Sequence, residues 1–142
     1  MKRPSSEVVD FLRGPHIAAL ATVRADGRPH VTPVWYEYDG AEFVVSTFRS
    51  SQKLRNVSRR GFASLCIYSQ ELPYRQVIVE GTARVGGPLD NVWRQRVATR
   101  YLGEAAGRAY VRDSADWDVA SIWIHPVRWI TEGFDAGQEE DR

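Results

Sequence analysis

Residues 17–47 read IAALATVRADGRPHVTPVWYEYDGAEFVVST, in which apolar runs are separated by two Asp-Gly pairs, Asp26-Gly27 and Asp39-Gly40. Asp-Gly supplies the positive-φ residue that a tight hairpin turn needs. The stretch therefore predicts three consecutive antiparallel strands, placed at Ile17–Val23, His30–Tyr38 and Glu42–Thr47.

Pro33 lies inside the second of these strands. Because proline has no amide hydrogen, it cannot take a normal place in a central ladder. We expect the strand to lie at a sheet edge or to carry a bulge at Pro33-Val34-Trp35. Bulges often adjoin binding sites, but protection of an edge explains Pro33 equally well.

Working outward, an opening helix is expected at Ser5–Arg13, where it would cover a barrel end, because a serine can cap it and Gly14-Pro15 ends it. Apolar patterning and breakers predict further helices at Ser50–Arg60 and Asn91–Leu102, a loop at Gly103–Trp117, and strands at Phe62–Ser69, Gln76–Val85, Ser121–His125 and Val127–Phe134. Six or seven short antiparallel strands predict a mainly β fold, a closed or split β-barrel with short flanking helices. An antiparallel sandwich is the alternative.

The composition fits a single globular domain over residues 1–142, with a disordered tail at residues 135–142. The net charge of +1 favours neither nucleic acid nor a membrane surface as a partner. A single cysteine, Cys66, excludes an intrachain disulfide, and the first residues lead into no apolar signal core. We therefore expect a cytoplasmic protein.

Positive charge is concentrated between Phe43 and Gln70, a segment with no acidic residue and a local charge of +5. Its cations are Arg49, Lys53, Arg55, Arg59 and Arg60. The predicted helix here begins after a strand with two serines, so backbone amides, hydroxyls and the Lys53 ammonium would converge where a phosphate binds well. A solvated helix face is the plainer interpretation.

Other chemistries find little support in the sequence. Gly86-Gly87-Pro88 lacks the glycine spacing of a dinucleotide or Walker loop, and His16, His30 and His125 are too scattered to indicate a metal site. Cys66 lies in an apolar strand with no nucleophile motif around it. Aromatic residues near the predicted loops, such as Trp35 and Trp117, are expected mostly in the core, but a few would suit a flat conjugated ligand beside the phosphate site.

Several motifs together resemble the pyridoxamine 5'-phosphate oxidase-like split-barrel superfamily, and within it the flavin and deazaflavin oxidoreductases that use coenzyme F-420 or FMN. They are Ile17–Val23, Asp26–His30, Thr32–Tyr36, Lys53–Asn56, Val79–Ala83 and Asp116–Asp118. The resemblance implies a homodimer with two cofactor sites at the subunit interface, each lined by both chains. It implies no dedicated catalytic side chain, because the cofactor carries the hydride chemistry; Tyr36 and His30 are candidate proton donors.

The resemblance also implies roles for individual residues. It places Pro33, Val34, Trp35 and Tyr36 along the flavin or deazaflavin ring, with Ser46 and Thr47 at the neighbouring strand end. It assigns Ser51, Gln52 and Lys53 to the phosphate clamp, and Tyr74 and Gln76 to the ring site of the second subunit. Relatives often carry an arginine where this chain has Ser51, so Arg49 or Arg55 would have to substitute for it.

Together these points predict an oxidoreductase that passes hydride from coenzyme F-420 to a conjugated small molecule such as a quinone, an enone or a biliverdin-like tetrapyrrole. The oligoglutamate tail of that coenzyme would meet Arg49, Arg55 or Arg59. Vitamin B6 oxidation is not expected, because the terminal arginine and histidine set of true pyridoxamine phosphate oxidases is missing. The alternatives are an FMN-dependent reductase or oxidase and a non-enzymatic carrier or sensor of a flavin or haem.

Overall fold

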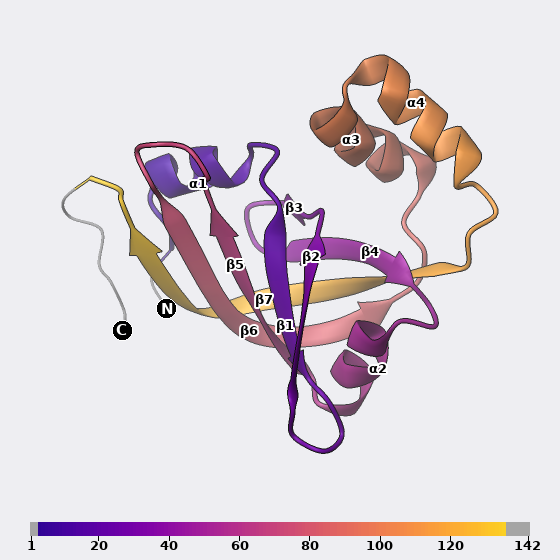
Figure 1. The fold of residues 1–142 in the computed structure, drawn as a ribbon, viewed down its shortest axis with the longest axis horizontal. Coiled ribbons are helices and arrows are strands. Elements are labelled where there is room, and N and C mark those ends of the chain that lie inside the picture. Colours follow the sequence, from indigo (N-terminus) through magenta and orange to yellow (C-terminus); the bar gives the residue numbers. More distant parts are fainter. Residues whose placement is uncertain (1–2, 136–142) are drawn as a thin grey trace.

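The computed structural model describes residues 3–135, which form one seven-stranded antiparallel sheet with four helices around it (Figure 1). The strands are β1 (Ala18–Val23), β2 (Pro29–Val34), β3 (Glu37–Tyr38), β4 (Phe43–Phe48), β5 (Phe62–Tyr68), β6 (Gln76–Gly86) and β7 (Val119–Glu132). The helices are α1 (Ser6–Leu12), α2 (Gln52–Arg59), α3 (Asn91–Leu102) and α4 (Glu104–Asp113). None of these helices is long and apolar enough to cross a membrane.

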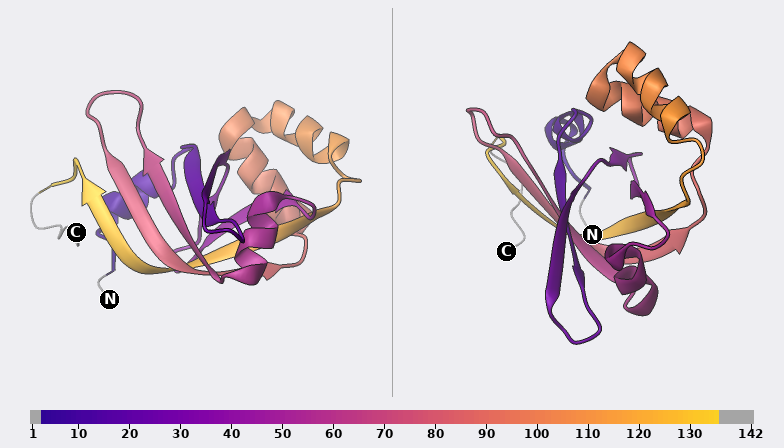
Figure 2. Two further views of the ribbon diagram at one scale, coloured as in Figure 1. Left: turned by 60° about the horizontal axis from the view of Figure 1, so that its bottom comes forward. Right: turned by 45° about the vertical axis from the view of Figure 1, so that its right-hand side comes forward.

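The strand order β2-β1-β5-β6-β7-β4-β3 shows why the sheet curls. Its two edge strands, β2 and β3, are joined by only Trp35 and Tyr36. Since two residues span only about 7 Å, the edges of the sheet must approach one another, and the sheet is correspondingly curved in Figure 2. The predicted split β-barrel is confirmed, and the sandwich alternative is wrong.

The second predicted strand is wrong as a single element. His30–Tyr38 is divided into β2, which pairs with β1, and β3, which pairs with β4 at the opposite edge. Pro33 does lie in an edge strand, as expected, and its pairing with Ala19 continues the β1–β2 register without a bulge. The break comes after Val34, because Tyr36 turns its ring into the core.

The last two predicted strands form one strand, β7, which runs through Pro126. The missing amide of Pro126 is tolerated because the β6–β7 register shifts between Glu80 and Gly81. A Cβ at Gly81 would lie 2.3 Å from the His125 carbonyl oxygen, so this close approach requires glycine.

The predicted loop at Gly103–Trp117 is also wrong, since most of it forms α4. Gly103 has a φ of 87°, which lets the chain reverse directly between α3 and α4. A Cβ at Gly107 would lie 2.9 Å from the backbone nitrogen of Thr99, so the two helices pack closely at this glycine. They form a hairpin that stands over one end of the sheet (Figures 1 and 2).

The three predicted helices are present close to their expected positions. Ser5 caps α1 by accepting a hydrogen bond from the Val8 amide, and Ser51 caps α2 in the same way. Val8 and Leu12 of α1 are buried with the inward side chains of the strands, so α1 closes one end of the barrel as expected. The predicted tail at residues 135–142 lies, apart from Asp135, outside the described residues.

Candidate functional site

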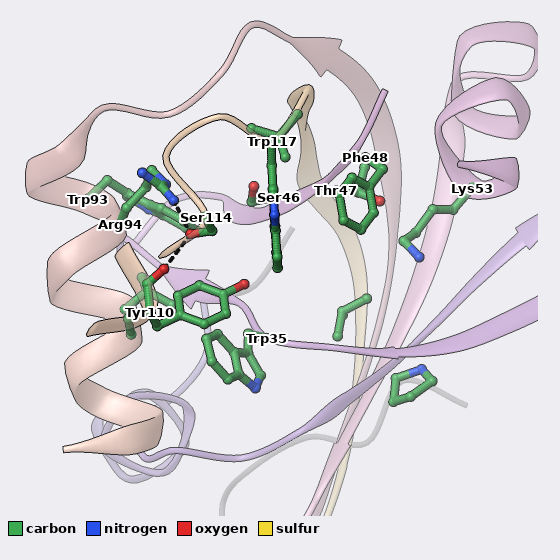
Figure 3. A pocket seen from close by; sticks show the side chains of 15 residues that line it. Trp35, Ser46, Thr47, Phe48, Lys53, Trp93, Arg94, Tyr110, Ser114 and Trp117 are labelled. Atoms are coloured by element: carbon green, nitrogen blue, oxygen red, sulfur yellow. Dashed lines mark hydrogen bonds between the residues drawn. The ribbon is translucent and has the colours of Figure 1, made fainter. Parts of the chain in front are cut away.

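A cavity of about 260 Å³ lies where the α3–α4 hairpin faces the sheet (Figure 3). One side, the sheet wall, consists of Pro33, Val34, Trp35, Ser46, Thr47, Phe48, Lys53 and Val119. The other side, the helical wall, consists of Trp93, Arg94, Val97, Ala98, Tyr110, Ser114 and Trp117. The lining residues include two cations and no carboxylate.

Trp35 enters the cavity because the backbone leaves the sheet at this residue. The next residue, Tyr36, is fully buried, and its hydroxyl donates to the Leu12 carbonyl at 2.8 Å. The Tyr36 amide donates to the hydroxyl of Tyr101 at 3.2 Å, and that hydroxyl donates to the His16 carbonyl at 2.6 Å. The break between β2 and β3 is thus fixed from α1 and α3, which leaves the Trp35 ring outside the core.

Aromatic rings continue from the sheet wall to the helical wall. Trp35 stacks on Tyr101 with centroids 4.8 Å apart and an interplanar angle of 4°, and it meets Tyr110 at 5.1 Å. Tyr110 in turn contacts Trp117 edge-on at 5.8 Å, and Trp117 contacts Phe48 at 5.2 Å. These rings give the cavity flat apolar surfaces, which suit a planar conjugated ligand.

The N-terminus of α2 supplies the polar end of the sheet wall. The Ser51 hydroxyl accepts the Leu54 amide at 3.2 Å and a hydrogen bond from the Thr47 hydroxyl at 3.1 Å. Lys53 lies in the first turn and lines the cavity, and burial lowers the pKa of its ammonium. No carboxylate within residues 3–135 pairs with it, so an anionic ligand would stabilise its charge.

Arg24 adds a further cation to this positive region, beside His30. Arg24 Nη2 lies 3.1 Å from His30 Nδ1. Desolvation and then the charges of Arg24 and Lys53 lower the pKa of His30, which favours the neutral ring. A neutral His30 accepts the Arg24 hydrogen bond and leaves both permanent charges available to an anion.

The other cations of the α2 region are held differently. Arg49 pairs with Asp118 at 3.0 Å, so its charge is compensated. Arg55 bonds the Ser50 carbonyl and Gln52, and Arg59 bonds the Val23 carbonyl at 2.9 Å. Among the described residues no carboxylate pairs with Arg55 or Arg59, and neither arginine lines the cavity.

A buried carboxylate fixes the helical wall to the sheet. Glu37 of β3 accepts hydrogen bonds from Arg96 at 2.7 and 2.9 Å and from Arg100 at 3.1 Å. The hydrogen bonds from Arg96 are the main reason why the pKa of Glu37 lies below its usual value. Since both arginines belong to α3, this carboxylate sets how α3 stands over the cavity.

The structure brings six of the twelve predicted cofactor residues to the cavity: Pro33, Val34, Trp35, Ser46, Thr47 and Lys53. Ser51 stands behind Thr47 as the helix cap. Tyr36 is in the core and does not line the cavity. Gln52 bonds Asn56 at 2.7 Å along the helix, and Arg55 bonds back to Ser50.

Tyr74 and Gln76 lie elsewhere, beside a second hollow that they line with Cys66, Tyr68 and Glu132 among others. Its lining shares no residue with the cavity. Next to it, one row of neighbouring side chains crosses the outer side of the sheet through β1, β5, β6 and β7, and all four members are only partly buried: Ala19, Cys66, Ile78 and Ile130. The sheet thus presents an apolar strip on the side away from the core.

Sequence reasoning did not assign the helical wall to the site. Trp93, Arg94, Tyr110 and Ser114 are spread over 22 residues, and only the α3–α4 hairpin brings them together. The signal that would have revealed α4 is the run from Glu104 to Arg108, EAAGR, which is rich in helix formers and directly follows a glycine.

The sequence comparisons identify relatives of this chain. A family model described as "Pyridoxamine 5'-phosphate oxidase" matches residues 5–132. Among curated proteins, the chain is 38% identical over 103 residues to an F420H(2)-dependent biliverdin reductase of Mycobacterium tuberculosis, a match that covers 70% of this chain and 73% of that protein.

Solved structures agree on the fold. A structure named F420 reductase aligns with a TM-score of 0.68 at 24% identity, covering 84% of this chain and 93% of the other. A conserved hypothetical protein from Mycobacterium tuberculosis aligns with a TM-score of 0.72 at 24% identity, covering 97% and 93%. Identities this low carry the split-barrel architecture only.

Proposed function

The chain belongs to the pyridoxamine 5'-phosphate oxidase-like split-barrel family, and from this premise we propose that it is an oxidoreductase that uses coenzyme F-420. The acceptor of the hydride would be a conjugated organic molecule such as a quinone, an enone or a biliverdin-like tetrapyrrole. We place the reaction in the cytoplasm, where the unpaired Cys66 would stay reduced.

The observation that carries this proposal is the chemistry of the cavity wall. Lys53 offers an uncompensated positive charge at a capped helix N-terminus, and Trp35 offers a flat apolar face on the same side. A phosphorylated planar coenzyme needs both features, the cation for the phosphoryl group and the ring for the deazaflavin. The residues present therefore fit such a group.

When bound, reduced coenzyme F-420 supplies a hydride. Lys53 and the first turn of α2 would hold its phosphoryl end, while Trp35, Pro33 and Val34 would pack along the ring. The helical wall would shield the far side of the cavity from solvent, which would protect a hydride donor from side reactions. Two of the lining hydroxyls, those of Ser46 and Tyr110, would hydrogen bond to the acceptor.

The charges outside the cavity favour the deazaflavin coenzyme over FMN. Coenzyme F-420 extends beyond its phosphate in an oligoglutamate tail, whereas FMN ends at the phosphate. Arg55 stands on the same helix as Lys53 with no carboxylate partner among the described residues. Arg49, in contrast, is already paired with Asp118, which leaves Arg55 and Arg59 as the residues to meet the tail.

We further propose that the active form is a homodimer. The apolar strip of Ala19, Cys66, Ile78 and Ile130 on the outer side of the sheet would be covered by a second copy. The exposed Tyr74 and the neighbouring Gln76 of that copy would then complete the ring site. Ile78→Lys should give a monomer in sedimentation analysis and weaken coenzyme binding, because a charge cannot be buried there without a partner. A wild-type monomer that binds the coenzyme at full strength would exclude the dimer.

Calorimetric titration with coenzyme F-420 and with FMN tests the cofactor assignment. Lys53→Ala should weaken binding of the true coenzyme by about 1.5 to 3 kcal/mol, the range for a charge-assisted contact. At low salt, Arg55→Gln should weaken coenzyme F-420 several-fold and leave FMN unchanged. Arg13→Gln is the matched control, because Arg13 is an exposed arginine at the end of α1.

Three results would count against the proposal. Tighter binding of FMN than of coenzyme F-420 would make the chain a flavin enzyme on the same scaffold. Unchanged affinity in Lys53→Ala would remove Lys53 from the site. Tight coenzyme binding without reduction of any quinone, enone or bilin in a panel would indicate a carrier.

A further inference from the structure

Helix α3 carries three arginines, which differ in whether a carboxylate pairs with them. The proposed function does not use this difference. Arg96 and Arg100 share Glu37 as their carboxylate partner, with contacts of 2.7 and 3.1 Å. Arg94, from the same helix, turns into the cavity instead. Among residues 3–135 no carboxylate pairs with it.

Neutral acceptors hold Arg94 in place. Its guanidinium donates to the Asn91 side chain at 3.2 Å, to the Val111 carbonyl at 3.5 Å, and to the Ser114 hydroxyl. Ser114 is itself held by the Tyr110 carbonyl at 2.6 Å (Figure 3). The guanidinium is thus oriented from both helices of the hairpin while its charge stays uncompensated. A partly desolvated charge of this kind is stabilised by an anionic ligand.

Arg94 and Lys53 lie on opposite sides of the cavity, with aromatic rings between them (Figure 3). Lys53 belongs to the end assigned to the phosphoryl group of the coenzyme, so Arg94 is left for the other reactant. Cavities for drug-sized ligands occupy about 300 to 1,000 Å³, so a tetrapyrrole would exceed about 260 Å³ and extend beyond these walls. An acidic substituent near one end of a conjugated system would meet Arg94 there.

We propose that Arg94 binds a carboxylate of the hydride acceptor, so that the chain selects planar conjugated acids over their neutral analogues. The inference rests on the proposed function, because it assigns the second reactant of the same site. Arg94 is placed as a specificity residue: its guanidinium is permanently charged, and its Nε hydrogen and second Nη1 hydrogen are not used by Asn91, Val111 or Ser114, so they can bind a carboxylate.

Biliverdin and biliverdin dimethyl ester form a matched pair of probes that differ only in their carboxylates. Spectrophotometric titration of the full chain, without coenzyme, measures their affinities independently of turnover. The wild-type chain should bind the acid at least about tenfold more tightly than the ester, a factor that corresponds to about 1.4 kcal/mol. Arg94→Gln should reduce this preference to near one, and Arg94→Lys should retain part of it, because the positive charge remains while the directed donors of the guanidinium are lost.

Arg108→Gln is the matched control, since Arg108 is an exposed arginine of α4 that pairs with Glu104 at 2.8 Å outside the cavity. It should leave the preference for the acid intact. Coenzyme affinity should stay within about twofold in Arg94→Gln, since the change lies across the cavity from Lys53.

Three results would overturn the inference. The first is equal binding of acid and ester by the wild-type chain. This result needs no variant, so it would overturn the inference even if Arg94→Gln fails to fold. The second is an equal loss of affinity for both probes in Arg94→Gln, which would mean that Arg94 only holds α3 and α4 together. The third is a loss of coenzyme affinity in the same variant, which would mean that Arg94 binds the coenzyme. An acid preference that depends on Arg94 in a chain that binds no coenzyme F-420 would support the anion site while refuting the proposed function.

Discussion

The two walls of the cavity are built on different principles. The sheet wall takes its residues from the ends of β2 and β4, the start of β7 and the first turn of α2, all tied to the barrel core. The helical wall takes its residues from the α3–α4 hairpin and the segment that follows it, and Arg96 and Arg100 of α3 form ion pairs with Glu37 of the sheet. One wall is part of the barrel, and the other is an attachment to it.

This difference suggests a division of labour. A coenzyme must be held in one geometry, which a wall continuous with the barrel core provides. Acceptors vary in shape and charge, and a hairpin outside the ladder can change its side chains without disturbing strand pairing. We therefore assign coenzyme binding to the sheet wall and acceptor selection to the helical wall.

The largest expected effect comes from cutting the helical wall from the sheet. Glu37→Gln removes the carboxylate that receives Arg96 and Arg100, and should lower the free energy of unfolding by about 2 kcal/mol, the scale of a charged hydrogen bond. Urea denaturation measures the change. The control is Glu42→Gln, whose partner Arg84 is more exposed, and it should cost less than about 1 kcal/mol. If both variants lose the same free energy of unfolding, Glu37 stabilises the fold no more than an exposed ion pair does.

The same variant makes a prediction about pH. Because its arginine partners lower the pKa of Glu37 below 4.5 in the folded chain, the stability it contributes is present at neutral pH. That contribution is lost as the pH falls through the folded-state pKa. The stability gap between wild type and Glu37→Gln should therefore be widest at neutral pH and close in acid.

The contrast between the walls also explains what the sequence could and could not predict. The sheet wall is encoded locally: Asp-Gly turns, a proline at a strand edge and a serine-capped basic helix each indicate their own structure. The helical wall depends on non-local contacts, such as Arg96 with Glu37, and on the Gly103 reversal that local patterning missed. Likewise, the sequence places Trp35 and Tyr36 within one strand. In the structure the strand is interrupted at these residues, because the buried Tyr36 hydroxyl donates a hydrogen bond to the Leu12 carbonyl.

A smaller effect is expected from the cap of the sheet wall. Ser51→Ala removes the acceptor for the Leu54 amide and for the Thr47 hydroxyl, and should destabilise the chain by about 1 kcal/mol. The neighbouring Ser50→Ala is the control, because the hydrogen bond that Ser50 makes with Arg55 uses the Ser50 carbonyl, which the substitution keeps. Thermal unfolding of both variants measures the difference. Coenzyme affinity should fall in Ser51→Ala alone, and acceptor selectivity should not change.

The smallest effect, a pH dependence, tests whether the charge of Lys53 is what binds the coenzyme. Burial lowers the pKa of this ammonium below 10.5, and only the protonated form attracts a phosphoryl group. Coenzyme affinity should therefore decline as the pH rises from 7 toward 9.5, by a few-fold at most, since an anion bound beside Lys53 raises its pKa again. Lys53→Arg should give a flat profile over the same range, because the guanidinium stays charged. Fluorescence titration measures both curves, and two superimposable profiles would show that the Lys53 proton plays no part in holding the coenzyme.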